Sequence, residues 1–238
     1  MVKYYGMKKL LKYFTPFEWI LWSVSVVSII VFFIAFKNEQ YLFLATSLVG
    51  VTSLIFLAKG NLVGLILTLA FSVAYTIIAF ISHYWSEVIT YFGMTLPIGI
   101  VCLIQWIKNP HKGKKTEVEI VELDKKEYGK IFVIAAIITI VFYWILKWCE
   151  TPNLIFATLS IFTSFIACYL SVKRSRFYAI AYFLNDIILI ILWALACVND
   201  LSYLAIVLCF VSFMANDLYG FINWTKMYKR QREENKND

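Results

Sequence analysis

Charged residues are scarce in this sequence. Only 16% of the 238 residues are Asp, Glu, Lys or Arg, whereas a soluble domain averages about 25%. Hydrophobic residues make up 61%, and the mean hydropathy is +0.75. Such a composition is typical of an integral membrane protein. Apart from the two tails, only residues 108–129 are polar over any length, which leaves no room for a soluble catalytic domain.

The side chains that build metal centres and disulfide frameworks are also few. The sequence has two histidines, His83 and His111, and five cysteines with no Cys-x-x-Cys pair or zinc-ligand spacing. It contains no Gly-x-x-x-x-Gly-Lys-Ser/Thr phosphate loop, no His-Glu-x-x-His and no Gly-x-Ser-x-Gly. We therefore expect no metal site, no cofactor and no catalytic residues, and we expect that the protein is not an enzyme.

Long apolar runs, by contrast, fill the chain. A transmembrane helix needs about 20 residues, and eight runs reach or approach that length. The first run begins at Trp19, lacks a small-residue cleavage site and is followed closely by another, so we interpret it as a retained helix rather than a signal peptide. The predicted spans are residues 19–36, 41–58, 61–83, 87–107, 130–148, 153–172, 177–198 and 201–224.

The positive charges lie beside these spans, mostly on one side. With both termini in the cytoplasm, only Lys37 and Lys147 of the 22 Lys and Arg residues fall outside. This asymmetry follows the positive-inside rule, and it supports both the orientation and the number of spans. Membrane topology therefore explains the net charge of +7, and we expect the cytoplasmic membrane as the location and no nucleic acid as a partner.

Two stretches 118 residues apart end alike. These are Ile104-Gln105-Trp106-Ile107-Lys108 and Ile222-Asn223-Trp224-Thr225-Lys226, and each closes a group of three apolar runs. The single run 130–148 between the groups gives both the same orientation, so the chain is predicted to hold one three-helix unit twice, in parallel. SWEET transporters use such parallel repeats, and transporters with duplicated units bind substrate where the repeats meet.

We therefore predict an all-α membrane protein with eight transmembrane helices in the order 1+3+1+3. The linker 108–129 is interpreted as a solvated connector, and the tail is expected to be disordered. The predicted regions are a basic N-terminal segment with a peripheral helix (1–40), the first three-helix repeat (41–107), the linker with the central helix (108–150), the second repeat (151–227) and a cytoplasmic tail (228–238).

The last predicted span carries a stripe of polar residues, which are costly inside a membrane. Ser212, Asn216, Tyr219 and Asn223 are spaced so that one helix face holds all four. Their hydroxyl and amide groups both donate and accept hydrogen bonds, which suits a neutral polar solute with ring and sugar oxygens. The alternative is that the stripe bonds to neighbouring helices.

The preceding span holds Asn185 and Asp186 near its middle, with Trp193 eight residues beyond Asn185. Asp186 and Asp217 are the only acids deep in the predicted spans, which makes them candidates for a proton-transfer or gating role. Protonated carboxyls that bond to neighbouring helices are the alternative. The Trp193 indole is a candidate for stacking on an aromatic solute, with core packing as its alternative.

The first group of three runs offers fewer polar groups. Thr68, Ser72 and Tyr75 share one helix face, on which Thr68 and Tyr75 are the candidates for substrate contact. Glu87 is expected at the outer edge in contact with solvent, and Pro97 is expected to kink its helix. The tryptophans at the span ends are interpreted as interfacial anchors. They are Trp85, Trp106, Trp148 and Trp224.

Over about residues 41–227 the sequence resembles the PnuC family of vitamin transporters. No single motif is specific, but their order, their spacing and the eight-helix frame make the set specific. The first-half motifs are Gly60-Asn61-Leu62-Val63-Gly64, Ser86-Glu87, Leu96-Pro97 and Trp106-Ile107-Lys108-Asn109. The second-half motifs are Asn185 with Trp193, Leu201-Ser202-Tyr203, and Asn216-Asp217-Leu218-Tyr219-Gly220-Phe221-Ile222-Asn223-Trp224.

This resemblance implies a full-length SWEET-like fold and a homotrimer in the lipid bilayer. It implies facilitated diffusion of a nucleoside-like vitamin, usually nicotinamide riboside, through a central occluded site, and an intracellular kinase that traps the solute by phosphorylation. Deoxyribonucleosides or thiamine are substrates of related branches. The sequence departs from the family pattern at Leu67, Phe71 and Gly99, where polar residues are expected, so the choice of substrate stays open.

Two other classes of function remain as alternatives. An intramembrane enzyme acting on lipids or quinones would use Asp186 and Asp217, although no recognisable spacing pairs them. A membrane scaffold would use the basic tails and tolerate apolar residues in the polar stripe. For a transporter, the predicted substrate contacts are Asn185, Trp193, Asn216, Tyr219, Asn223, Thr68 and Tyr75.

Overall fold

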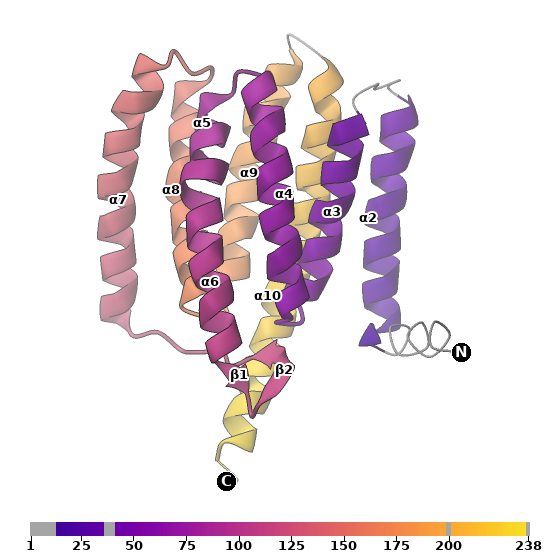
Figure 1. Ribbon diagram of the computed structural model, residues 1–238, viewed down its shortest axis with the longest axis vertical. Helices are drawn as coiled ribbons and strands as arrows, with labels where there is room; N and C mark the ends of the chain where they lie inside the picture. The colour runs from indigo at the N-terminus through magenta and orange to yellow at the C-terminus, as the bar shows by residue number, and fades with distance from the viewer. Residues whose placement is uncertain (1–12, 36–40, 199–200, 237–238) are drawn as a thin grey trace.

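The computed structural model describes residues 13–35, 41–198 and 201–236, and in these ranges the chain is almost entirely helical (Figure 1). The long helices are α2 (Pro16–Ala35), α3 (Tyr41–Leu57), α4 (Leu62–Ile81), α6 (Leu96–Lys108), α7 (Lys125–Trp148), α8 (Leu154–Val172), α9 (Tyr178–Cys197) and α10 (Leu204–Glu234). The shorter elements are α5 (Trp85–Val88), the π-helix η1 (Ile89–Thr95), the 3₁₀-helix η2 (Leu201–Tyr203), β1 (Pro110–His111) and β2 (Lys114–Val118).

Within the described ranges, seven helical runs are long and apolar enough to cross a membrane. They are α2, α4, the continuous run from α5 through η1 to α6, α7, α8, α9 and α10. Helix α3 is apolar too but shorter, with 17 residues. The predicted all-helical membrane architecture is thus confirmed. Each of the eight predicted spans corresponds to one of the seven runs or to α3.

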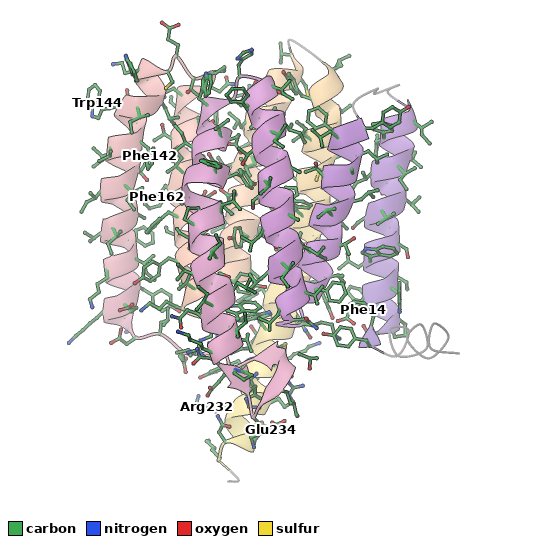
Figure 2. All side chains as sticks on the ribbon, viewed as in Figure 1. Phe14, Phe142, Trp144, Phe162, Arg232 and Glu234 are labelled. Atoms are coloured by element: carbon green, nitrogen blue, oxygen red, sulfur yellow. The ribbon has the colours of Figure 1, made fainter. Side chains whose placement is uncertain are left out.

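The helices stand side by side, with α7 at one edge of the bundle and α2 at the other (Figure 1). Helix α7 packs mainly on α8, whereas α2 packs on α3 and α10. The outward face of α7 is apolar, with Phe132, Ile137 and Ile140 all exposed, and Trp144, labelled in Figure 2, is 62% exposed. An apolar exposed face of this kind suits contact with lipid.

The linker and the end of the chain form a small unit below the bundle. Helix α10 continues to Glu234, and the β1–β2 hairpin lies against this extension (Figures 1 and 2). The Gln231 side chain donates to the Val118 carbonyl at 3.0 Å and accepts from the Ile120 N–H at 2.9 Å. The prediction of a disordered tail is wrong for the described part, in which α10 continues to Glu234. The linker is largely exposed, as expected of a solvated connector, but these contacts bury Val118 and Ile120 against the helix.

Helix α7 also begins earlier than the predicted start at residue 130. The Asp124 carboxylate accepts a hydrogen bond from the Glu127 N–H at 2.7 Å and so caps the first turn. The Glu127 side chain in turn accepts from Lys173 at 2.8 Å, at the end of α8. This hydrogen bond raises the pKa of the Lys173 ammonium. The polar start of α7 is therefore fixed by bonds that an apolar-run criterion does not detect.

A π-helix interrupts the span that contains Pro97. Proline has no N–H, and its ring clashes with the carbonyl of the residue four positions earlier, so a regular α-helix is disfavoured just before it. Here the Leu96 N–H donates to the Tyr91 carbonyl, five residues back. The kink that we expected at Pro97 takes the form of this π-helical turn, which carries Tyr91 and Thr95.

Helices α3 and α4 approach each other closely at Gly64. A Cβ atom at this position would lie 2.6 Å from the Leu57 nitrogen and 2.9 Å from the Ser53 carbonyl oxygen. Because both atoms belong to backbone, no side-chain rotation relieves the overlap. Glycine is therefore required at this position by packing.

We expect Gly64→Ala to lower the free energy of unfolding by about 1–3 kcal/mol, because α3 and α4 must move apart. Gly93→Ala is the matched control, since nothing lies within 4 Å of a Cβ there, and it should change stability by less than about 0.5 kcal/mol. Thermal unfolding of the purified protein in detergent measures both. Equal melting temperatures for the two variants would contradict the close approach.

Candidate functional site

A narrow polar cavity lies at the centre of the bundle, among α3, α4, η1, α8, α9 and α10. The cavity has a volume of about 70 Å³, which is enough for several water-sized groups. Its hydroxyl lining consists of Ser53, Thr68, Ser72, Thr95, Ser164 and Ser171. Its aromatic lining consists of Phe71, Tyr91, Tyr178, Tyr182 and Phe213.

Several of these hydroxyls already donate to the protein backbone. Ser53 donates to the Gly50 carbonyl at 2.7 Å. Thr68 donates to the Gly64 carbonyl at 2.9 Å, and Ser72 donates to the Thr68 carbonyl at 2.8 Å. A hydroxyl whose proton is engaged in this way keeps its lone pairs, so it meets a ligand as a hydrogen-bond acceptor.

Asn185 brings an amide into the cavity from α9. Its Oδ1 accepts from the hydroxyls of Thr163 at 2.8 Å and Ser164 at 2.9 Å. The side chain is only 3% exposed, so these two bonds fix its orientation. With the oxygen engaged, the Nδ2 amino group is the part of Asn185 that can donate to a ligand.

Asp186 and Asp217 bring two carboxyl groups into the same cavity, from α9 and α10. They are 3% and 6% exposed and lie close to each other. Because two negative charges at close range in a buried site repel each other strongly, at most one of the two carboxyls is ionised. Within the described part of the chain, the buried Oδ2 of Asp186 has no hydrogen-bond partner, so this atom is left to interact with a ligand.

Aromatic side chains close the end of the cavity that faces the α4–α5 connection. The Tyr75 ring stacks on Phe71 at 5.4 Å and lies 4.4 Å from Tyr91. Behind this layer the Trp193 ring lies 4.4 Å from Tyr84. All five side chains are buried, so a solute can leave in this direction only if the rings move.

The opposite end is closed by Trp106 and Trp224, whose ring centroids are 5.3 Å apart. The Trp106 indole donates to the Ser171 carbonyl at 3.1 Å, and the Trp224 indole donates to the Leu57 carbonyl at 2.9 Å. The prediction that these two tryptophans are interfacial anchors is wrong, because both are buried and bonded across the bundle. Trp148, which is 85% exposed, has the position expected of an anchor.

The structure brings four of the predicted site residues together in the cavity, and two more lie in the layer that closes it. The four are Asn185, Asp186, Asp217 and Thr68. Tyr75 and Trp193 belong to the aromatic layer, where their ring centroids are 6.4 Å apart. Substrate contact by these residues stays a prediction, but their positions are consistent with it.

The polar stripe of α10 lies outside the cavity. The Asn216 Nδ2 donates to the Ser25 hydroxyl of α2 at 3.3 Å. The Tyr219 hydroxyl donates to the Glu18 carboxylate at 2.8 Å, and Glu18 forms an ion pair with Lys59 at 3.1 Å. These residues therefore dock the N-terminal helix onto the rest of the bundle.

Asn223 bonds to the turn between α3 and α4 instead, where its Nδ2 donates to the Ala58 carbonyl at 2.7 Å. Ser212 donates to the Leu208 carbonyl of its own helix at 3.0 Å. Asn216, Tyr219 and Asn223 are therefore not among the residues that line the cavity, and substrate contact by them stays a prediction. The periodicity does place them on one face, but α2 and the α3–α4 turn cover that face.

Sequence reasoning missed several residues that line the cavity. Ser53 was not indicated by any pattern that we considered, whereas Glu87, Tyr91 and Thr95 follow one another at four-residue spacing, and Tyr91 and Thr95 of this set line the cavity. Tyr178, Tyr182 and Asn185 are spaced at i, i+4 and i+7, and this one-face pattern on α9 is a signal that would have found the two tyrosines.

Glu87 occupies a different environment from the one we expected. It is fully buried rather than solvated, because α8 packs against the short helix α5. Among the described residues, neither of its carboxylate oxygens has a hydrogen-bond partner. Glu87 is not part of the cavity lining, so it forms a second buried acid site nearer the end of the bundle.

Comparison with known proteins gives consistent matches over nearly the whole chain. The family model described as nicotinamide mononucleotide transporter matches residues 40–226. The nicotinamide riboside transporter PnuC of Neisseria mucosa is 23% identical over 222 residues, which cover 91% of this chain and 83% of that protein. PnuC of Haemophilus influenzae is 23% identical over 216 residues, covering 90% and 92%.

A solved structure shares the fold. The crystal structure of the vitamin B3 transporter PnuC superimposes with a TM-score of 0.81 at 22% sequence identity. The match covers 92% of this chain and 94% of that one. The helical arrangement described above is therefore one already seen in a membrane transporter.

We expect Trp224→Phe to lower the free energy of unfolding by about 1 kcal/mol. The variant keeps a ring between Trp106 and Tyr178 but removes the N–H that bonds to the Leu57 carbonyl. Trp148→Phe, at an exposed position, should leave stability unchanged within about 0.5 kcal/mol. Thermal unfolding in detergent compares them, and a Trp224→Phe variant as stable as the wild type would show that the bond contributes nothing.

Proposed function

Since the chain belongs to the nicotinamide mononucleotide transporter family, we propose that it carries nicotinamide riboside across the cytoplasmic membrane. The observation that carries this proposal is the central cavity, whose lining combines hydroxyl, amide and carboxyl groups with aromatic rings. Ligand sites commonly combine an apolar aromatic lining with a few placed polar groups. The relatives in Neisseria mucosa and Haemophilus influenzae carry the name of nicotinamide riboside transporters, which supports this choice of solute.

Transport on this proposal is facilitated diffusion by alternating access. The aromatic layer around Tyr75 opens toward one side of the membrane, and the Trp106–Trp224 pair opens toward the other, so that the cavity is never open to both. An intracellular kinase then traps the solute as its phosphate. On this proposal the termini lie in the cytoplasm, which the positive charges beside the spans support. The protein assembles as a homotrimer, which the family resemblance supports.

We also propose that the two groups of three helices are parallel repeats in a 1+3+1+3, SWEET-like order. Matching contacts in the two halves support this. Gly60 and Arg174 stand in equivalent turns, after α3 and α8, and both have positive φ, +66° and +57°. Their carbonyls each accept a hydrogen bond from the linker, from Val118 at 3.2 Å and from Val121 at 3.1 Å.

The two buried indoles support the same symmetry. Trp106, in the third helix of the first half, donates to the end of α8, the first helix of the second half. Trp224, in the third helix of the second half, donates to the end of α3, the first helix of the first half. Reciprocal bonds of this kind arise naturally when two copies of one unit face each other across an axis.

Uptake by the purified protein in sealed proteoliposomes tests the function. We expect saturable entry of radiolabelled nicotinamide riboside, chemically unchanged and independent of an imposed proton or sodium gradient. Enclosed nicotinamide riboside kinase with ATP should turn equilibration into accumulation. Entry of thiamine or a deoxyribonucleoside instead would replace the substrate, and chemical conversion without entry would favour an enzyme.

Asn185→Ala should weaken nicotinamide riboside binding by about tenfold, because it removes the Nδ2 donor and frees two hydroxyls that were oriented by Oδ1. Asn216→Ala is the matched control, an amide of the same type that faces α2, and it should leave the affinity within about twofold. Isothermal titration calorimetry measures both affinities. A larger loss in Asn216→Ala than in Asn185→Ala would return the site to the α10 stripe.

A further inference from the structure

We infer that the Asp186–Asp217 pair recognises the positive charge of the ligand. The cavity on this view selects a solute with a fixed cationic ring nitrogen, such as an N-glycosylated pyridinium, over a neutral solute of the same shape. This inference rests on the proposed function, since it takes the central cavity as the site of transport. It deepens that function by naming the feature of the solute that is selected.

The charges around the cavity are unbalanced. Its lining contains two acidic residues, Asp186 and Asp217, and no Lys, Arg or His of the described chain. Because the two buried carboxyls lie close together, repulsion between them leaves at most one negative charge on the pair. A monocation bound beside the pair supplies the one positive charge that balances it.

The surroundings of the pair offer no cation of their own. The titratable neighbours are Tyr91 of η1 and Cys209 of α10 near Asp186, and Tyr178 and Tyr182 of α9 near Asp217. The cavity-lining residues of α3, α4 and α8 are hydroxyl-bearing, aliphatic or aromatic. An uncompensated charge in such a buried site is strongly unfavourable, whereas a charge that meets an opposite charge on the ligand is compensated.

One carboxylate oxygen is free to make that contact. Asp186 lines the cavity, and its buried Oδ2 atom has no hydrogen-bond partner among the described residues. Buried polar atoms in folded proteins are nearly always paired, so an unpaired acceptor on a cavity-lining residue indicates a missing partner. The partner must donate a hydrogen bond or carry positive charge.

The rest of the wall has the same preference. The hydroxyls of Ser53, Thr68 and Ser72 donate to backbone and therefore offer only lone pairs to the cavity. The rings of Phe71 and Phe213 also line it, and their centroids lie 5.3 Å apart. Aromatic faces attract cations, so acceptors, carboxyls and rings all favour an electron-poor, positively charged ligand.

A preference for cations distinguishes among the candidate substrates that the sequence leaves open. Nicotinamide riboside carries a fixed positive charge on its pyridinium nitrogen, and thiamine carries one on its thiazolium ring. Deoxyribonucleosides are neutral. Reduced nicotinamide riboside, with a dihydropyridine ring, keeps nearly the shape of the cation but has no charge, which makes it the sharpest comparison.

The test is calorimetric titration of the purified full-length protein with four ligands: nicotinamide riboside, its reduced form, thiamine and deoxyadenosine. The wild type should bind nicotinamide riboside at least about tenfold more tightly than the reduced form. Asp186→Asn and Asp217→Asn should each weaken the cation by about tenfold or more and change the affinity for the reduced form by less than about threefold. Glu87→Gln is the matched control, because it neutralises a buried acid outside the cavity and should leave the preference for the cation intact.

The outcomes separate this inference from the proposed function. Equal affinity for the charged and reduced forms, or an equal loss of both in the Asn variants, overturns the charge recognition while nicotinamide riboside remains a ligand. Binding of thiamine alone, lost in the Asn variants, supports the charge recognition and overturns the proposed substrate. Binding of deoxyadenosine alone, or of none of the four, overturns both. Retained binding of the reduced form shows that a variant is folded, and a variant that fails to fold leaves the other Asn variant to decide.

Discussion

Two indole hydrogen bonds hold the halves of this protein together at one end of its cavity. Trp106 donates to the end of α8 and Trp224 to the end of α3, so each bond joins the third helix of one group to the first helix of the other. In an apolar medium a free indole N–H or a free carbonyl is costly, so breaking either bond would destabilise the fold. Both bonds end next to the cavity, since Ser171 and Leu57, whose carbonyls accept them, belong to its lining.

Satisfaction of buried polar groups also explains which polar residues are structural. Asn216 and Tyr219 find partners on α2, and Asn223 finds one at the α3–α4 turn. By contrast, the Oδ2 of Asp186 is without a partner among the described residues, and the hydroxyls around it offer only acceptors. The polar stripe of α10 therefore bonds to neighbouring elements, whereas Asp186 and Asp217 lie in the cavity wall.

The acids of the cavity both come from the second half of the chain, on α9 and α10. The first half contributes hydroxyls, aromatic rings and the π-helical turn before Pro97. This division of chemistry fits the three first-half departures from the family pattern. Phe71 lies in the cavity wall where a polar group was expected, so the first half presents a ring and the second half supplies the charge.

The sequence alone determined the membrane class, the number of apolar runs and the polar residues that a membrane makes costly. Those features follow from composition and from helix length, which depend only on residues near one another in the chain. It also indicated Asn185, Asp186, Asp217 and Thr68, because polar side chains deep in a span are rare. Only the tertiary structure decided which polar face meets a cavity and which meets a helix, since a stripe on α10 looks the same in both cases. Burial of Trp106, Trp224 and Glu87, and the pairing of Asp186 with Asp217 across two helices, were likewise decided by packing between segments far apart in the sequence.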